Sequence, residues 1–407
     1  MVRSIRYIMI VVLLFGLTGC WNRVELNELW VSAATGVDTT DDGQWIVSYQ
    51  IIVPSAITSG TGGSGGSSQP ASYVFSVKAK TFNQAWSYST MDSSRRIYIA
   101  HNRVIYIGKK AAEKGLDHLV DFYLRNTEAR ELVTMVITEG LASDILKKIM
   151  PPEKLQGAAM HDLIDNESDI LSVYPKVRVF DFALSMNSDS RSIGIPVAGL
   201  VGEKDQKNEK EAESLDVLKK TSTPLKLRLT KLAVFQNGKL KGFLNEEEGL
   251  GVSYLSQKIK NTEISFPCSE QPDRESYSSF RVNSADVKLR PRKTGYHYKM
   301  QVKVKVNGTL IETTCMKDIS QTHTIRDMEG EISKEVTRVI NEGWTRLQEL
   351  GVDAVGFADQ IHRKFPRDWR TVKKDWDKEF KKMELDIQVD ARIRRPGLQQ
   401  RHIGSKT

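Results

Sequence analysis

The first twenty residues constrain the rest of the chain most, because they decide on which side of a membrane it folds. Arg3 and Arg6 precede an almost wholly apolar run that ends in Leu17-Thr18-Gly19-Cys20. A positive start, an apolar run and a small residue before a cysteine are typical of a lipoprotein export signal. The run is shorter than the ~20 residues of a membrane-spanning helix. We therefore predict a signal peptide over residues 1–19 and a body that folds outside the membrane.

Cys20 is the residue that we predict to carry the lipid, after cleavage between Gly19 and Cys20. Its thiol would take a diacylglyceryl group, and two acyl chains on one residue anchor a protein stably where a single chain binds only marginally. An ordinary cleaved signal beside an unrelated cysteine is the alternative. No second long apolar segment follows in the sequence, so we expect only the lipid to enter the bilayer.

The other two cysteines, Cys268 and Cys315, lie in the C-terminal half. In an extracytoplasmic protein they can form a disulfide, and two free buried thiols are the alternative. Neither the cysteines nor the seven histidines have a metal-binding spacing, and we expect no metal or cofactor. The formal charge of +8 is too diffuse to indicate nucleic acid binding, but it suits a protein held against an anionic membrane.

A chain of 407 residues exceeds the size at which single cores stop growing, so we expect two or three domains. Residues 20–202 alternate strand and helix patterns, which indicates an N-terminal α/β module. Strands are expected at 31–37, 45–53, 73–79, 103–107, 132–138, 180–185 and 193–201, and helices at 81–91, 111–123 and 142–149.

A Gly/Ser tract over residues 59–68 interrupts this module, and we expect it to form a flexible loop because Gly and Ser cannot build a core. The tract formally matches a nucleophile elbow at 62–66 and a dinucleotide fingerprint at 60–65. Both motifs act only on a tight turn from strand to helix, whereas Pro70 and more loop follow here. No nucleophile lies in an activating context elsewhere, so we expect no enzyme.

The charged segment 203–223 has few apolar residues and is expected to be a linker, or a long hairpin loop since good strands flank it. A C-terminal α+β module is expected over 224–396, which could divide near 270–285, followed by a basic tail at 397–407. Asn237-Gly238 and Asn307-Gly308 predict hairpin turns. Strands are expected at 225–236, 239–244, 264–266, 284–289, 298–306, 309–313 and 385–393.

Helical spacing marks the end of this module. Apolar residues recur at intervals of three and four from Ile332 to Leu350, which predicts a long helix that ends at Gly351. A shorter helix is expected to end at Phe365, and another covers 369–383. The predicted fold class is therefore α+β with two to three domains, in which helices pack on mixed or antiparallel sheets.

The candidate contact surface is a basic segment between residues 363 and 382, with nine Lys and Arg against four acidic residues. It could bind anionic headgroups or an acidic partner, and a solvated helix face with i,i+4 ion pairs is the alternative. Trp369, Trp376 and Phe380 recur at helical spacing here and are expected in the core. The candidate surface residues are Arg363, Lys364, Arg367, Arg370, Lys373 and Lys374.

With these elements placed, the sequence resembles the C-subunit lipoproteins of the nutrient germinant receptors of endospore-forming bacteria. The resemblance covers nearly the whole mature chain, and the closing block is its most specific part. It departs at Asn22, where the family usually has Asp, and at the 59–68 insert. The residues that carry it are Gly19 to Arg23, Glu25 to Asn27, Gly36-Val37-Asp38, Arg96, His101-Asn102-Arg103, Gly108, Ala111-Ala112, Gly115-Leu116, Arg125-Asn126, Arg130, Ala233-Val234-Phe235, Lys239-Leu240, Gly242-Phe243-Leu244, Gly351-Val352-Asp353, Gly356-Phe357, Phe365-Pro366, Trp369, Trp376 and Phe380.

The resemblance implies a multi-domain α/β fold and a non-enzymatic, lipid-anchored subunit on the outer face of the inner spore membrane. It implies two integral membrane subunits as partners, and nutrients that trigger germination through the complex. Whether this subunit binds the germinant itself is left open. An extracytoplasmic solute-binding lipoprotein serving a transporter is the alternative, although such proteins have two similar lobes and this chain shows no internal repeat.

Overall fold

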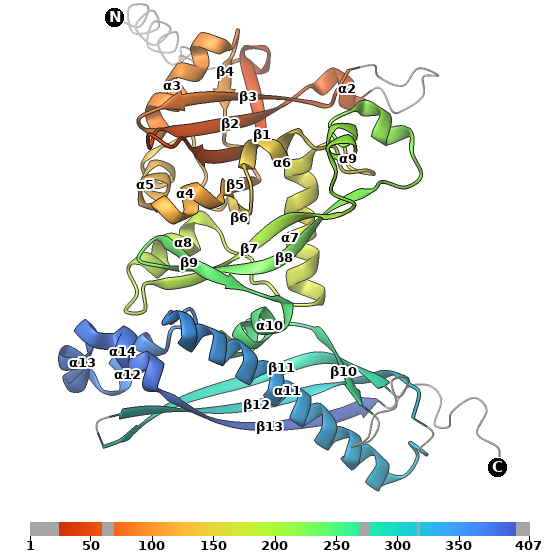
Figure 1. Cartoon of the computed structure of the whole chain (residues 1–407), viewed down its shortest axis with the longest axis vertical. Helices are drawn as coiled ribbons and strands as arrows, with labels where there is room; N and C mark the ends of the chain where they lie inside the picture. Colours follow the sequence, from red (N-terminus) through yellow and green to blue (C-terminus); the bar gives the residue numbers. More distant parts are fainter. Residues whose placement is uncertain (1–23, 59–68, 268–276, 296, 316–317, 396–407) are drawn as a thin grey trace, which may run out of the picture.

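The computed structural model describes residues 24–58, 69–267, 277–295, 297–315 and 318–395. Two sheets follow one another along the long axis of the molecule, and helix α10 (Glu246–Leu255) lies between them (Figure 1). We call the first sheet with its helices the N-terminal lobe, and the second sheet with its helices the C-terminal lobe. The α/β character that the resemblance implies and the predicted mixed sheets with packed helices are both present.

The sheet of the N-terminal lobe has nine strands within the described residues, in the order β3-β2-β1-β5-β6-β7-β8-β9, with β4 paired to β1. The central pairs β1–β5, β5–β6 and β6–β7 are parallel, and the flanking pairs are antiparallel. The strands are β1 (Leu29–Thr39), β2 (Trp45–Ile52), β3 (Ser72–Ala79), β4 (Arg96–Tyr98), β5 (Val104–Gly108), β6 (Thr134–Thr138), β7 (Ser192–Gly202), β8 (Leu225–Gln236) and β9 (Lys239–Leu244).

Helices cover both faces of this sheet. Ile105 and Ile107 of β5 belong to one apolar cluster, with residues of α3, α4, α5 and α8, whereas Val104 and Tyr106 belong to another, with residues of α6 and α7. The second cluster continues into the core of the C-terminal lobe. These helices are α3 (Phe82–Asp92), α4 (Lys109–Lys114), α5 (Asp117–Arg125), α6 (Ala142–Lys147), α7 (Gln156–Ile170) and α8 (Val179–Met186).

Two predictions for these helices are wrong. The segment predicted as a strand at 180–185 lies in helix α8, because Val179, Phe182 and Ala183 are buried at helical spacing. The helix predicted at 111–123 is two helices, α4 and α5, since Gly115 between them has a φ of 119°, which a side chain rarely allows. Helix α7 was not predicted, because its exposed face is dominated by polar residues.

The charged segment 203–223 connects β7 to β8, which are antiparallel neighbours in the first sheet. It contains helix α9 (Gln206–Glu211) and the short 3-10 helix η2 (Leu215–Lys219), and Ala212 and Val217 are buried. Strands β8 and β9, which the sequence placed with the C-terminal module, therefore complete the sheet of the N-terminal lobe. Their Asn237-Gly238 hairpin is confirmed, with φ of 51° and 76°.

The sheet of the C-terminal lobe has the order β10-β11-β12-β13, with β12 and β13 parallel. Met300, Val302 and Val304 are buried as predicted. The hairpin predicted at Asn307-Gly308 is wrong, because β12 runs straight through both residues. A side chain at position 308 would come within 2.0 Å of the Arg281 carbonyl oxygen on the next strand. The strands are β10 (Thr262–Pro267), β11 (Tyr277–Thr294), β12 (His297–Thr313) and β13 (Glu384–Arg395).

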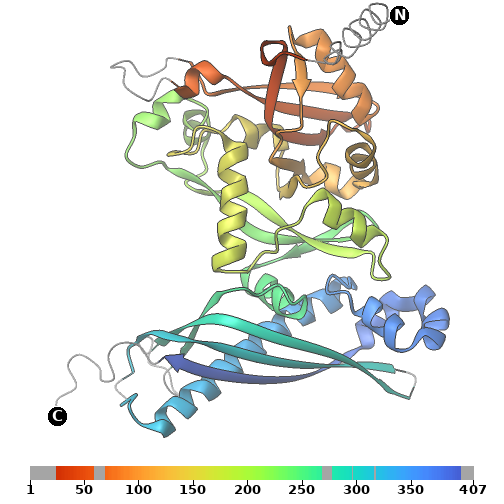
Figure 2. The ribbon, with the colours of Figure 1, turned by 180° about the vertical axis from the view of Figure 1, so that it is seen from behind.

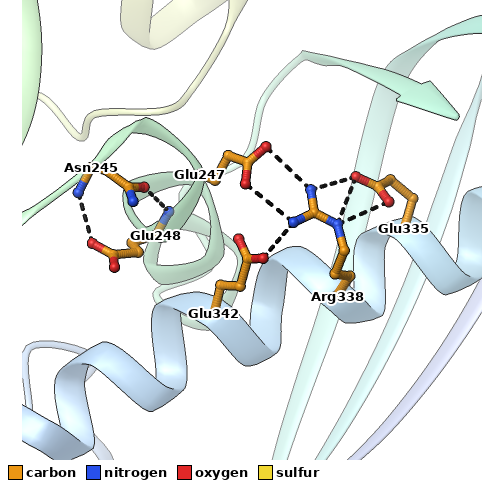
Figure 3. A network of polar contacts seen from close by, with 6 residues as sticks. All are labelled: Asn245, Glu247, Glu248, Glu335, Arg338 and Glu342. Atoms are coloured by element: carbon orange, nitrogen blue, oxygen red, sulfur yellow. Dashed lines mark hydrogen bonds and ion pairs between the residues drawn. The ribbon is translucent and has the colours of Figure 1, made fainter. Parts of the chain in front are cut away.

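Helix α11 (Thr322–Leu350) packs on one face of this sheet and ends at Gly351 in the left-handed conformation, as predicted. It also packs closely on α10, where a Cβ at Gly343 would lie 2.6 Å from the Glu248 carbonyl oxygen. Beside this contact, Arg338 of α11 forms ion pairs with Glu247 of α10 and with Glu335 and Glu342 of its own helix (Figure 3). Helix α10 was missed because its start, Glu246 to Gly249, has a glycine and no apolar spacing.

Short elements complete the C-terminal lobe: α12 (Phe357–Lys364), α13 (Pro366–Val372), the 3-10 helix η3 (Lys373–Asp375) and α14 (Trp376–Lys382). Cys315 is disulfide-bonded, which excludes the free-thiol alternative for this residue. Its candidate partner Cys268 lies outside the described residues, as do Gly19, Cys20, the 59–68 loop and the basic tail. No helix in the described ranges is long and apolar enough to cross a membrane.

Candidate functional site

The basic segment predicted as a contact surface folds as the end of α12, α13, η3 and α14. Its six candidate cations, Arg363, Lys364, Arg367, Arg370, Lys373 and Lys374, are all exposed. Trp369, Trp376 and Phe380 are buried on the inner side of the same helices, so the core interpretation of these aromatic residues is confirmed. Trp369 and Trp376 make an edge contact with ring centroids 5.3 Å apart.

The cations are not neutralised by ion pairs along their own helices. Among the residues that the structure describes, none of the six forms an ion pair with a carboxylate. The acidic neighbours are engaged elsewhere: Asp368 with Lys293, Asp375 with Lys378, and Glu379 with His297. The i,i+4 pairing that the solvated-face alternative requires is therefore absent from these six residues, which leaves a locally positive surface.

Buried Asp353 holds these helices in place. Its carboxylate accepts hydrogen bonds from the backbone N–H groups of Phe357 (2.9 Å) and Ala358 (2.7 Å) at the start of α12. It also accepts one from Trp376 Nε1 at 3.1 Å, which ties α12 to α14. Burial raises the pKa of Asp353 to about 7 despite these three donors.

The same arrangement occurs in the N-terminal lobe. Asp38 accepts hydrogen bonds from the backbone N–H groups of Ala142 (2.8 Å) and Ser143 (3.0 Å) at the start of α6. Burial raises the pKa of Asp38 as well. Both aspartates close a Gly-Val-Asp sequence, at 36–38 and 351–353, which the sequence analysis noted only as part of a resemblance. Each therefore caps the start of a helix, and Asp38 fixes its helix to β1 whereas Asp353 fixes its helix to α14.

A second cluster joins the basic segment to the N-terminal lobe, and we call it the lobe latch: Asp189, Asp359, His362 and Trp369. The Asp189 carboxylate lies 2.7 Å from His362 Nδ1 and accepts a hydrogen bond from Trp369 Nε1 at 3.2 Å. In the reverse direction, the Asp359 carboxylate accepts hydrogen bonds from the backbone N–H groups of Asp189 and Ser190. The imidazole of His362 stacks on the indole of Trp369.

A polar pocket of about 480 Å³ opens beside the lobe latch. It lies between the α8–β7 loop and the β8–β9 turn on one side and η3 on the other. Lys373 and Lys374 belong to its lining, so two of the six predicted surface residues face the junction of the lobes. Gln236 crosses the junction and donates to Asp377 at 2.8 Å. The latch was missed by sequence reasoning because its partners are more than 160 residues apart.

The molecule carries no cluster of three metal-ligating side chains within the described ranges. What the site provides is a positive, exposed helical surface held by buried aromatic rings, a buried aspartate and a polar latch. This arrangement presents no nucleophile and base in mutual contact.

Comparison with known proteins agrees with this architecture. A family model described as "Spore germination protein N-terminal domain" matches residues 22–200, and one described as "Spore germination B3/ GerAC like, C-terminal" matches residues 230–397. Spore germination protein KC of Bacillus subtilis is 29% identical over 94% of this chain and 93% of its own. Spore germination protein B3 of the same organism is 22% identical over 94% of this chain and 95% of its own.

The fold is also similar to that in the crystal structure of the GerBC protein. The TM-score is 0.51 at 18% sequence identity, and the match covers 89% of this chain and 97% of that one. Together the two family models extend over both lobes, including the Gly351 to Phe380 block that carried the resemblance in sequence. The chain thus belongs to the GerAC-like spore germination family, the family of the C subunits of germinant receptors.

Proposed function

We propose that this protein is a lipid-anchored subunit of a nutrient germinant receptor, which assembles with two integral membrane subunits on the outer face of the inner spore membrane and catalyses no reaction. The observation that carries the proposal is the family membership of both lobes together with the Leu17 to Cys20 export pattern. The two lobes share an apolar cluster and the lobe latch, which suits a rigid assembly component.

The anchor would determine which end of the molecule faces the bilayer. Val24, the first described residue, is four positions after Cys20, so an extended chain could span at most about 15 Å between them. Strand β1 begins at Leu29 beside β4, at the end of the long axis that carries α3 (Figure 1). The basic helices α12 and α13 lie in the other lobe. They would therefore point away from the anchored end and meet protein rather than the same stretch of lipid.

The experiment for the anchor compares the wild-type chain with Cys20→Ala during growth with a labelled fatty acid. Wild type should incorporate the label and remain in the membrane fraction, and Cys20→Ala should do neither. Thr18→Ser keeps the cysteine and a small side chain beside it, so it should be labelled as the wild type is. Equal labelling of Cys20→Ala would refute the anchor.

The experiment for the receptor role is deletion of the gene, followed by measurement of growth and of nutrient-triggered germination. Germination with nutrients should be lost while growth is unchanged, and the wild-type gene should restore it. A growth defect with normal germination would contradict the proposal. Calorimetry of the leaderless chain with nutrient mixtures then tests the solute-binding alternative, because micromolar binding by the isolated chain would favour a transporter-type protein.

A further inference from the structure

Among the residues that the structure describes, no helix covers one of the two faces of the sheet of the C-terminal lobe. Helix α11 packs on the inner face, where Met300, Val302 and Val304 are buried, and the opposite face is open when the molecule is turned by 180° (Figure 2). Side chains on the open face come from alternate positions of β11, β12 and β13. We call this the open face, and it is built from Asp286, Lys288, Arg290, Arg292, Lys299, Gln301, Lys303, Lys305, Glu384, Asp386, Gln388 and Asp390.

Positive charge dominates the two central strands of the open face. Between positions 286 and 292 of β11 and 299 and 305 of β12, six outward side chains are Lys or Arg, and Asp286 is the one acidic residue. Lys288 is 3.5 Å from Asp286 and Lys299 is 3.4 Å from Glu384. The remaining four cations form no ion pair with any residue that the structure describes, and they are Arg290, Arg292, Lys303 and Lys305.

The strand register places like charges directly opposite one another. Lys288 pairs with Lys303 across β11 and β12, and Arg292 pairs with Lys299. Like charges at such positions destabilise a sheet, because their side chains leave on the same face about 5 Å apart. In the isolated chain, water screens this repulsion, and the burial of apolar side chains on the inner face offsets what remains of it. A partner that brings carboxylates to the open face would convert the repulsion into attraction.

The basic helices of the candidate site contact one end of the same sheet. At the turn end of β11, Lys293 forms an ion pair with Asp368 of α13, and Lys364 of α12 donates to the Pro291 carbonyl oxygen at 2.7 Å. These contacts place α12 and α13 at the end of the strands that carry Arg290, Arg292 and Lys299. Pro291 and Lys293 alternate with Arg290 and Arg292 along β11, so α12 and α13 lie on the side of the sheet opposite to the open face.

We propose that the open face binds an acidic, solvent-exposed protein surface on one of the integral membrane subunits of the receptor. This inference rests on the proposed function, because it presumes that such subunits are the partners. Charge complementarity is the recognition principle, with carboxylates of the partner opposite β11 and β12. The outward residues of β13 add Glu384, Asp386 and Asp390 beside the cations, so the partner would carry basic groups along one border.

The acidic border favours a protein over a bilayer as the occupant. A uniformly anionic membrane would attract β11 and β12 but repel the three carboxylates of β13 on the same flat face. A protein surface can match both rows, because its charges are fixed in a pattern. The position of the predicted lipid anchor also favours a protein as the occupant, because the lipid would attach at the N-terminal lobe.

The experiment uses the full-length, tagged chain co-expressed with the two membrane subunits, and measures how much of them is retained after solubilisation. The test variant is the triple substitution Lys288→Glu, Arg290→Glu and Lys303→Glu. The control variant is Lys204→Glu, Lys207→Glu and Lys210→Glu, which makes the same charge change at exposed positions around α9. The test variant should lose about tenfold in retention, whereas the control should retain as much as wild type.

Three outcomes would overturn the inference. Undiminished retention of the membrane subunits by the test variant would exclude the open face as their binding surface. Intact retention combined with loss of binding to phosphatidylglycerol vesicles would assign the face to lipid. A wild-type dimer in sedimentation that the test variant dissociates, with retention unchanged, would assign it to a second copy of this chain.

The proposed function fails separately, if the wild-type chain retains neither membrane subunit. Circular dichroism of each variant reports whether the chain is folded. If the Glu substitutions prevent folding, the neutral set Lys288→Gln, Arg290→Gln and Lys303→Gln removes the charge without reversing it. This set should reduce retention in the same direction, and full retention by a folded neutral variant would also overturn the inference.

Discussion

The sheet of the N-terminal lobe is covered on both faces, whereas the sheet of the C-terminal lobe is covered on one. The difference is visible in the strands themselves. All five residues of β5 are buried, while β12 alternates buried Met300, Val302 and Val304 with exposed or half-buried polar residues. Parallel central strands with helices on both sides lose contact with water altogether, so they contribute stability. A sheet that helices cover on one side only keeps polar side chains on its other side.

Substitutions at neighbouring positions should reveal this difference with the largest effects. Val104→Asn and Ile105→Asn point to opposite faces of β5, and each should lower the free energy of unfolding by about 3 kcal/mol or more, because each buries an amide in an apolar cluster. On β12, Val302→Asn should cost as much, but Lys303→Asn should change the free energy by less than about 0.5 kcal/mol. Urea unfolding of the leaderless chain measures all four. A large cost at Lys303 would contradict the open face.

Buried carboxylates should give the next largest effect, and they should do so in both lobes. The pKa of Asp353 is raised by burial from 3.8 to about 7, and that of Glu167 in the N-terminal lobe from 4.5 to about 7. Each group binds its proton more tightly in the folded state, so its contribution to stability falls as the pH rises from about 4 to about 7 and returns on acidification. Asp353→Asn and Glu167→Gln remove this dependence.

The measurement is the free energy of unfolding between pH 4 and 7 for wild type and each variant. Relative to either variant, wild type should gain up to about 1.4 kcal/mol for each unit by which the pH falls. Asp375→Asn is the matched control, because the hydrogen bond to Lys378 lowers the pKa of this exposed residue and the variant should keep the gain of stability on acidification. If the free energy of unfolding varied with pH in the same way for wild type and Asp353→Asn, burial would not favour the protonated form of Asp353.

Much of this two-lobed organisation can be read from the sequence, but the connections between the lobes cannot. The regular alternation of Tyr298 to Val306 predicted a one-sided strand, and Ile332 to Leu350 predicted a helix, since both periods persist over many residues. The hairpin predicted at Asn307-Gly308 was wrong because Gly308 does not form a turn. It allows the neighbouring strand to approach closely. The sequence predicted the six surface cations, but it did not predict that they form no ion pair with the described residues. The lobe latch could not be predicted because its residues are distant in sequence.

Close packing of α10 on α11 joins the lobes, and two glycines of α11 distinguish packing from helix propensity. Gly343→Ala should lower the free energy of unfolding by about 1–3 kcal/mol, because its Cβ would lie 2.6 Å from the Glu248 carbonyl oxygen. Gly330→Ala lies in the same helix with no atom within 4 Å of the new Cβ, so it should raise that free energy by about 0.5–1 kcal/mol. Thermal unfolding of both variants tests the pair. If both substitutions changed the free energy of unfolding in the same direction, the packing argument would be contradicted.

The lobe latch should give the smallest effect on stability and the most specific one on the relation between the lobes. Asp189→Ala removes the acceptor of the largely buried Trp369 Nε1–H and of His362, which should cost about 1–2 kcal/mol. Asp162→Ala breaks an exposed 4.0 Å contact with Arg103 inside one lobe and should cost less than about 0.5 kcal/mol. Native-state hydrogen exchange should show faster exchange in α12 and the α8–β7 loop for Asp189→Ala, with β5 unaffected. Uniform acceleration across both sheets would mean that the latch supports global stability and does not specifically join the lobes.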